Sequence, residues 1–204
     1  MADIKFAIFD MDQVLYDYDH RTRLALLEQL TGRAAADIDA AVWGGPHENA
    51  AEAGNPDTAE GYLAQFARLL DYPIDFDTWV DIRRKMMRPR SDVLDLVRDI
   101  RKSADVALLT NNGMMLKAAL PVCAPEAVAI FGDKAHVSAE FRCRKPDPLV
   151  YLRICERYCR KPEESVFVDD RPDNVAGAEL AGLQGHVFST AEGLKAFLHR
   201  VGLA

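Results

Sequence analysis

The stretch Ile4-Lys5-Phe6-Ala7-Ile8-Phe9-Asp10-Met11-Asp12 decides the fold of this chain. Its first six residues are mostly apolar, as expected of a strand that is buried on both faces of a parallel sheet. Two carboxylates, Asp10 and Asp12, follow directly where this strand should end. Because two unneutralised acids at this spacing repel each other, we expect a positive charge between them, most simply a divalent cation bound by oxygen ligands.

Short apolar runs of the same kind recur along the rest of the chain. They lie at residues 105–109, 165–168 and 184–188, with a weaker one at 136–141. Helical patterns occupy the segments beside them, at residues 91–104, 147–159, 174–181 and 191–201. Strand and helix therefore alternate, which predicts an α/β fold with a doubly wound, Rossmann-like parallel sheet as its core.

One long segment, residues 16–88, breaks this alternation. It contains only helical patterns, at residues 21–30, 34–42, 58–70 and 76–87, separated by glycines and prolines. We expect a small inserted helical domain here, with residues 1–15 and 89–204 forming the α/β core. The basic run Arg83-Arg84-Lys85-Met86-Met87-Arg88-Pro89-Arg90 is interpreted as a solvated helix end, where cations are favoured.

Composition narrows the function classes. The chain has 204 residues and a net charge of −7, which argues against a nucleic-acid binder, because such proteins carry basic faces. No apolar stretch approaches the ~18 residues of a membrane span, and the start of the chain lacks a signal-peptide pattern, so we expect a cytoplasmic protein without a membrane partner. Nothing in the pattern indicates the oligomeric state.

Polar residues follow the other predicted strands as well. Thr110-Asn111 follows the second strand, Lys145 precedes a helix, and Asp169-Asp170 follows a later strand. Because ligands bind at the carboxyl ends of such strands, we expect these groups to meet at one site. Carboxylates suit Mg²⁺, while a lysine and a hydroxyl can neutralise a phosphoryl group. One aspartate can act as nucleophile and a second carboxyl group as general acid/base, which suits phosphoryl transfer.

These motifs, in this order, resemble those of the haloacid dehalogenase (HAD) superfamily. The resemblance covers essentially the whole chain, and the insertion lies where that family has its helical cap. It rests on four stretches: Phe9-Asp10-Met11-Asp12, Thr110-Asn111, Lys145-Pro146-Asp147-Pro148 and Val168-Asp169-Asp170.

The resemblance implies a role for each motif residue. It makes Asp10 the nucleophile and a magnesium ligand, and Asp12 the general acid/base with its backbone carbonyl on the metal. Thr110 and the backbone of Asn111 would hold the phosphoryl oxygens. Lys145 would neutralise both nucleophile and phosphate. Asp170 would bind magnesium, with Asp169 in or beside the ligand shell.

Two details concern the subfamily. Dehalogenases of this superfamily usually lack an acid at the position of Asp12, so its presence favours phosphate-ester hydrolysis. The string Asp-Asp-Arg-x-x-Asn-Val, with Leu-Thr-Asn-Asn-Gly, is similar to the glucose-1-phosphate phosphatase-like branch, which includes the phosphatase domain of soluble epoxide hydrolases. That likeness places Asn174 near the outer shell of the metal. Gln13 departs from the family's usual glycine and leaves the geometry of the following turn open.

The expected function is therefore that of a Mg²⁺-dependent phosphomonoester hydrolase that acts through a phospho-aspartyl intermediate. Its partner would be a small phosphorylated metabolite, with a sugar phosphate as one candidate. The alternatives are a phosphomutase, a 2-haloacid dehalogenase and a non-catalytic HAD-fold binding module. In the insertion, Tyr16, His20, Trp43 and His47 are candidates for substrate specificity, against the alternative that they are ordinary structural residues.

Overall fold

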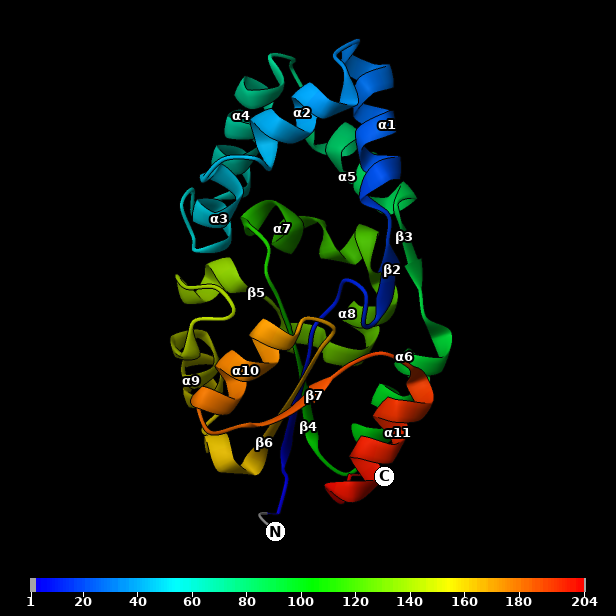
Figure 1. Ribbon diagram of the computed structural model, residues 1–204, viewed down its shortest axis with the longest axis vertical. Helices are drawn as coiled ribbons and strands as arrows, with labels where there is room; N and C mark the ends of the chain where they lie inside the picture. Colours follow the sequence, from blue (N-terminus) through cyan, green and yellow to red (C-terminus); the bar gives the residue numbers. More distant parts are fainter. Residues whose placement is uncertain (1–2, 204) are drawn as a thin grey trace.

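The computed structural model describes residues 3–203 and has a parallel sheet at its centre. Within this range the sheet has five strands in the order β5-β4-β1-β6-β7, and every neighbouring pair is parallel. The central strand is β1 (Phe6–Phe9), between β4 (Asp105–Thr110) and β6 (Ser165–Asp169). The outer strands are β5 (Ala135–Val137) and β7 (Gln184–Val187). This arrangement confirms the predicted doubly wound sheet (Figure 1).

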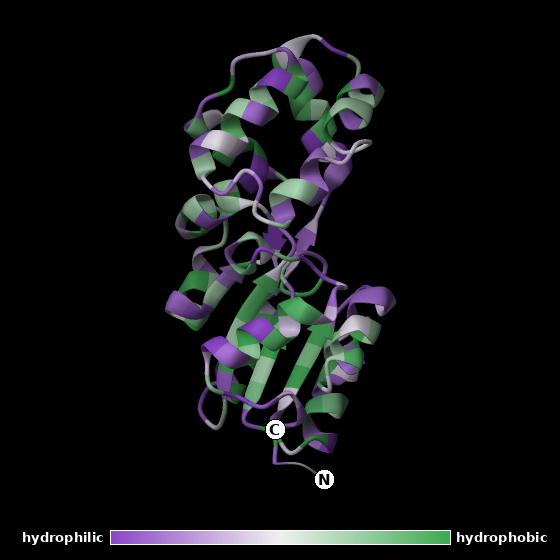
Figure 2. Cartoon of the chain, turned by 90° about the vertical axis from the view of Figure 1, so that its left-hand side faces the viewer, coloured by the Kyte–Doolittle hydropathy of each residue, from purple (hydrophilic) through white to green (hydrophobic). Residues whose placement is uncertain are grey.

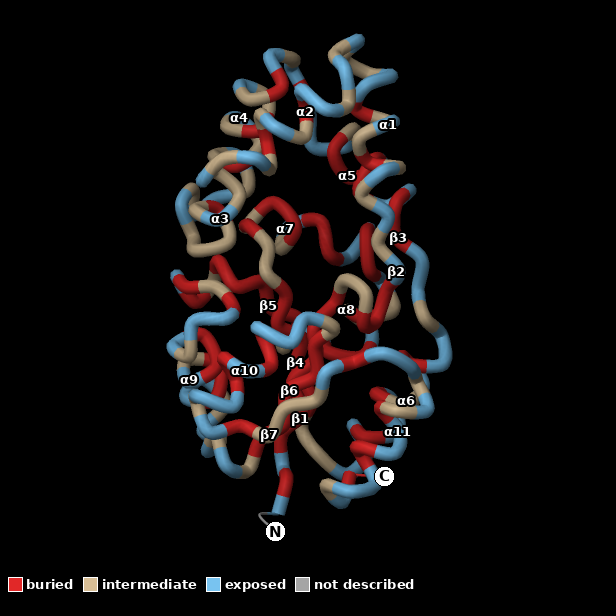
Figure 3. The backbone as a smooth tube through the Cα atoms, viewed as in Figure 1, coloured by how far each residue is buried: buried red, intermediate tan, exposed pale blue. Residues whose placement is uncertain are grey.

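The alternation of side chains along β1 explains why both faces of the sheet are covered. The buried apolar residues form two hydrophobic clusters. Phe6 and Ile8 belong to the smaller cluster, with buried residues of α9 (Pro148–Arg157) and α10 (Pro172–Leu180). Ala7 and Phe9 belong to the larger cluster, which includes residues of three further helices that cover the sheet. Those helices are α6 (Ser91–Ile100), α8 (Pro125–Phe131) and α11 (Ala191–Arg200). The three central strands are accordingly mostly hydrophobic in Figure 2 and buried in Figure 3, whereas the edge strand β7 is only partly buried.

Five helices, which we call the helical unit, lie together beyond the carboxyl ends of the strands (Figure 1). They are α1 (His20–Thr31), α2 (Ala35–Val42), α3 (His47–Glu52), α4 (Ala59–Leu70) and α5 (Phe76–Lys85). An antiparallel ribbon of β2 (Tyr16–Tyr18) and β3 (Met87–Pro89) connects them to the sheet domain. Side chains of Asp19, Thr58 and Asp75 cap α1, α4 and α5 by accepting backbone N–H groups, as good N-cap residues do.

The helical unit rests on α7 (Met114–Cys123), which contacts both α4 and α5. Buried residues of α7 belong to the same apolar cluster as Leu27 of α1 and Phe9 of β1, so one core runs from the sheet into the helical unit. Among residues 3–203, no single helix is long and apolar enough to span a bilayer. One pair of helical segments in this range, α7 and Pro125–Lys134, has the length and apolar composition of a span when the two are joined, but the chain bends by 99° between them.

Three local predictions need correction. The glycine-rich break after Trp43 is short and is followed by α3, so the described insertion has five helices where the sequence patterns indicated four. The weak strand predicted at 136–141 ends at Val137, and a 3₁₀ turn follows it.

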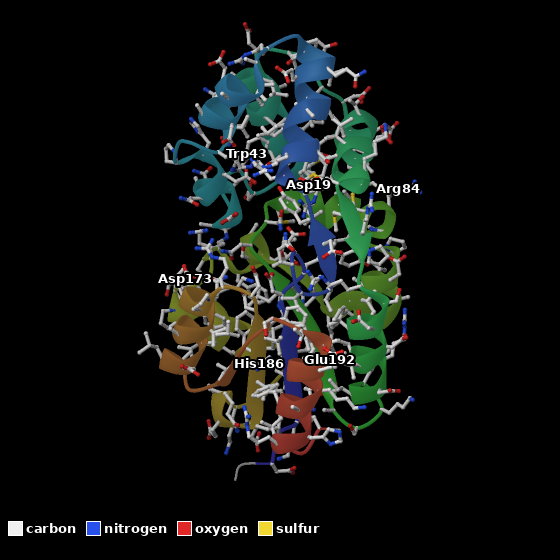
Figure 4. The ribbon with its side chains drawn as sticks, turned by 45° about the vertical axis from the view of Figure 1, so that its right-hand side comes forward. Asp19, Trp43, Arg84, Asp173, His186 and Glu192 are labelled. Carbon is white, nitrogen blue, oxygen red and sulfur yellow. The ribbon has the colours of Figure 1, made fainter. Side chains whose placement is uncertain are left out.

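The solvated helix end predicted at 83–90 is wrong for Arg83. Only 2 % of its side chain is exposed, because it lies on the inner face of α5 beside Trp79, Val80 and Ile82. Arg84, the next residue, is exposed on the outside of α5 (Figure 4).

Candidate active site

Three neighbouring strands bring polar side chains to one edge of the sheet. Asp10 directly follows β1, Thr110 is the last residue of β4, and Asp169 is the last residue of β6. A cavity of about 320 Å³ opens at this edge. Its lining includes every predicted catalytic and phosphate-binding residue; the lining residues are Asp10, Asp12, Gln13, Tyr18, Glu52, Thr110, Asn111, Arg144, Lys145, Asp170, Arg171 and Asn174.

Lys145 is the buried cation of this cavity. Its Nζ lies 2.7 Å from Asp10 Oδ1 and 2.6 Å from Asp169 Oδ2, and only 1 % of its side chain is exposed. Burial alone would lower the pKa of Lys145, but the two carboxylates raise it above its usual value, so the ammonium stays charged. Asn111 holds the lysine in place, because its side chain accepts the Lys145 N–H and donates to the Lys145 carbonyl, both at 2.9 Å.

The adjacent acids Asp169 and Asp170 have different environments. Asp169 is fully buried and accepts hydrogen bonds from Lys145, from the Arg171 N–H at 2.9 Å and from Asn174 Nδ2 at 3.0 and 3.1 Å. Asp170 is half-buried, and no other side chain between residues 3 and 203 donates to its carboxylate. Asp170 is thus the acid of this pair that is free to bind a metal, while Asp169 has its donors in the protein.

The carboxylates of Asp10, Asp169 and Asp170 can place one oxygen each within 4.8 Å of one another. Burial, together with the nearby Asp169, raises the pKa of Asp10 to about 8, although Lys145 acts in the opposite direction. Asp10 Oδ1 is buried and accepts no aligned hydrogen bond, even with Lys145 Nζ nearby. Asp10 and Asp169 thus share the ammonium of Lys145, and the hard oxygen donors of this group of three acids fit a magnesium ion.

Asp12 pairs with a cation from the helical unit. Arg83 Nη2 lies 2.9 Å from Asp12 Oδ1 and 2.7 Å from Oδ2, and its guanidinium stacks 4.6 Å from the centre of the Tyr18 ring. Asp10 and Asp12 thus have separate cations, Lys145 for Asp10 and Arg83 for Asp12. Sequence reasoning missed Arg83. The available signal was its spacing from Trp79, which places both side chains on one face of α5.

Gln13 has the left-handed backbone conformation that a glycine adopts without strain. Its φ of 64° lies in the left-handed region, which costs a non-glycine residue about 1–2 kcal/mol. Two hydrogen bonds offset this cost: the Gln13 N–H donates to the Tyr16 carbonyl at 2.7 Å, and Gln13 Nε2 donates to the Tyr18 carbonyl at 2.8 Å.

The four specificity candidates make contacts of their own outside the cavity lining. Tyr16 is buried, and its hydroxyl donates to Glu126 and accepts the Ala127 N–H. His20 packs edge-on against Trp43 (labelled in Figure 4), and His47 begins α3. The described cavity lining includes none of these four residues.

Two other residues of the insertion, Tyr18 and Glu52, do line the cavity. Glu52 forms an ion pair with Arg144 of the sheet domain, yet burial raises the pKa of its carboxyl group to about 7. Sequence analysis carried no signal for Glu52, because its position at the end of α3 becomes meaningful only when that helix contacts the sheet domain.

The sequence model of the haloacid dehalogenase-like hydrolases matches residues 4–182. This chain belongs to that family. The match confirms the predicted superfamily and identifies the protein as a HAD-like hydrolase.

Comparisons with individual proteins agree with the family. Flavin mononucleotide hydrolase 1, a chloroplast protein of Arabidopsis thaliana, is 38% identical over 60 residues, which are 29% of this chain and 24% of that protein. This HAD-like hydrolase therefore matches about a quarter of the length of that relative.

Solved structures share the fold at low identity. A predicted HAD-like hydrolase of Porphyromonas gingivalis superposes with a TM-score of 0.79 at 22% identity, over 98% of each chain. A HAD family enzyme of Bacteroides thetaiotaomicron, crystallised with magnesium and inorganic phosphate, gives 0.75 at 18% over 91% of this chain and 94% of its own. A 2-haloacid dehalogenase of Pseudomonas syringae gives 0.64 at 18% over 97% and 99%.

Proposed function

We propose that this HAD-like hydrolase is a Mg²⁺-dependent phosphomonoester hydrolase that acts on a small phosphorylated metabolite through a phospho-aspartyl intermediate. One observation carries the proposal. Asp10 lies buried beside Lys145 in a cavity of about 320 Å³, with a second acid, Asp12, two residues further along the same loop. A nucleophile, a buried cation and a separate acid/base are the parts that phosphoryl transfer through an aspartate requires.

The residues divide the reaction between them. Asp10 attacks phosphorus while the bond between phosphorus and the leaving oxygen breaks, and Asp12 donates a proton to that oxygen. Asp12 then takes a proton from the water that attacks phosphorus and releases Asp10. Lys145 and Thr110 stabilise the charge on the phosphoryl oxygens, together with the backbone N–H of Asn111.

We propose that Asp10, Asp170 and the backbone carbonyl of Asp12 hold the magnesium ion. When bound, Mg²⁺ would supply positive charge beside the phosphoryl oxygens, in addition to the one buried ammonium that Asp10 shares with Asp169. Asp169 is left in a supporting role, because Asn174, Arg171 and Lys145 already occupy its carboxylate.

We further propose that residues 16–88 act as a cap over the core formed by residues 1–15 and 89–204. Tyr18 and Glu52 of the insertion line the cavity, so the leaving group of a substrate would contact them. The relative with the flavin mononucleotide hydrolase name makes FMN, itself a phosphomonoester, one of the first compounds to test beside sugar phosphates.

The direct test is hydrolysis of a chromogenic aryl phosphate with and without Mg²⁺, followed by a panel of phosphorylated metabolites. We expect turnover that needs the metal, that Asp10→Asn abolishes, and that Asp12→Ala abolishes while phosphate-analogue binding persists. Full activity of Asp10→Asn would refute the covalent mechanism. Release of halide from 2-haloacids, with no phosphate release from any ester, would instead assign the protein to the dehalogenases.

A further inference from the structure

The contact between Asp12 and Arg83 joins the two parts of the molecule at the general acid/base. Asp12 belongs to the loop that follows β1, whereas Arg83 belongs to α5 of the helical unit, 71 residues away in sequence. Nη2 of Arg83 touches both carboxylate oxygens of Asp12 at 2.9 and 2.7 Å. The Arg83 side chain is 2 % exposed, whereas that of Asp12 is 24 % exposed and lines the cavity.

The helical unit does not need this ion pair in order to bury an arginine. Arg23 of α1 is also buried, and its guanidinium lies over the rings of Trp43, Phe66 and Trp79. No carboxylate within residues 3–203 forms a salt bridge with it. The partners of the Arg23 guanidinium are these rings and the Tyr18 hydroxyl, to which Nη1 donates at 3.4 Å. Because Arg23 is buried without a carboxylate, and because a buried ion pair is weak evidence of a gain in stability, the contact of Arg83 with Asp12 calls for another explanation.

We propose that Arg83 is a positioning residue that orients the Asp12 carboxyl group for its proton transfers. This inference rests on the proposed phosphatase function. A single nitrogen that contacts both oxygens restricts rotation of the carboxyl group, while the exposed side of Asp12 still faces the leaving oxygen. Arg83 keeps all its protons, because a guanidinium is not deprotonated in proteins. The proton passes from Asp12 to the leaving oxygen, and Asp12 regains one from the attacking water.

The contact also links catalysis to the position of the helical unit. Arg83 lies on α5, and its guanidinium is held against the Tyr18 ring of the connecting ribbon. If the helical unit moves away from the sheet domain, Arg83 moves with α5 and Asp12 loses its orienting partner. The general acid is then correctly aimed only when the helical unit covers the cavity.

The test uses how strongly the reaction depends on the leaving group. The quantity kcat/KM reports the steps through phosphoenzyme formation, in which an alkyl leaving group needs a proton and a p-nitrophenyl group scarcely does. We expect Arg83→Met to lower kcat/KM for an alkyl phosphate by about 10²-fold, the size of a misplaced catalytic group, and for p-nitrophenyl phosphate by less than about threefold. Arg83→Lys, which retains the charge, should recover part of the alkyl activity.

Two matched controls and one double variant make the test specific. Arg84→Met removes a cation from the outer face of the same helix, and Lys85→Met removes the exposed cation beside it; neither should change the alkyl-to-aryl ratio. The residual single-turnover rate of Asp12→Asn, measured with protein in excess over substrate, should not fall further when Arg83→Met is added, because Arg83 acts through Asp12. Thermal melting checks the fold of each variant, and Arg83→Lys carries the test if Arg83→Met unfolds.

Three outcomes would overturn the positioning role. They are equal losses for alkyl and aryl esters, a full additional loss in the Asp12→Asn background, or an equal change of the ratio in the Arg84→Met control. These results are distinct from failure of the proposed function. If the wild-type protein hydrolyses no phosphomonoester with Mg²⁺, the phosphatase proposal fails, and the role of Arg83 falls with it.

Discussion

Replacing Lys145 by methionine should destabilise the protein and inactivate it. The Nζ lies 2.7 and 2.6 Å from carboxylates whose side chains are 9 % and 0 % exposed, so its removal leaves two buried acids without their cation. Breaking a buried pair by removing one partner costs about 3–5 kcal/mol. At about 2–4 °C per kcal/mol for a chain of this size, Lys145→Met should lower Tm by about 6–20 °C.

The assay is thermal unfolding followed by circular dichroism, with and without Mg²⁺, beside phosphatase activity. Mg²⁺ should recover part of the lost Tm, because it supplies positive charge to the same carboxylates. Activity should fall at least about 10²-fold, the loss expected from one electrostatic donor in an active site. Lys5→Met is the matched control, because Lys5 pairs with Glu164 at the surface with 44 % of its side chain exposed. Its Tm should scarcely change, because an exposed ion pair contributes little to stability.

A Lys145→Met variant that melts within a few degrees of the wild-type protein and keeps its activity would refute this reasoning. It would mean that Asp10 and Asp169 tolerate burial without the ammonium. A normal Tm with lost activity would retain the catalytic role of Lys145 and reject only the energetic argument.

Three further predictions concern neighbouring structure. Gly177→Ala should lose about 1–3 kcal/mol of stability and most activity, because a Cβ there would lie 2.1 Å from the carbonyl oxygen of Pro146, next to Lys145; an unchanged Tm would contradict this. Glu52→Gln should remove a pH dependence of stability. The pKa of Glu52 is about 7 in the folded protein against 4.5 in the unfolded chain, so the free energy of unfolding of the wild type should fall by up to about 3 kcal/mol as pH rises from 4.5 to 7. Parallel curves of unfolding free energy against pH for the wild type and the variant would contradict this. Tyr16→Phe should cost about 1–3 kcal/mol by leaving the Ala127 N–H unpaired, with unchanged KM.

The sequence predicted the sheet and the catalytic edge well because both depend on short local patterns. A buried strand at residues 4–9 must place Asp10 and Asp12 at its carboxyl end, and parallel neighbours must bring Thr110 and Asp169 to the same edge. The family match confirmed the superfamily to which these motifs pointed. The roles of the individual site residues stay predictions for the experiments above.

The helical unit was less predictable because its important contacts are distant in sequence. Arg83 belongs to a basic run whose usual place is a solvated helix end, and only the packing of α5 turns it toward Asp12. Glu52 and Tyr18 reach the cavity only after α3 and the ribbon meet the sheet domain. His20 and Trp43 pack against each other, and their role in specificity stays a prediction. Local patterns do not reveal which face of a short helix meets another domain.

The central claim is that Asp10 forms a covalent phosphoryl intermediate. The most direct measurement is mass spectrometry of peptides from protein quenched in acid within milliseconds of mixing with Mg²⁺ and a phosphomonoester that it hydrolyses. The account predicts the added mass of one phosphoryl group on the peptide that contains Asp10, and no such peptide in Asp10→Asn. Rapid turnover of the ester with Asp10 always unmodified, or a phosphoryl group on a different residue, would contradict it.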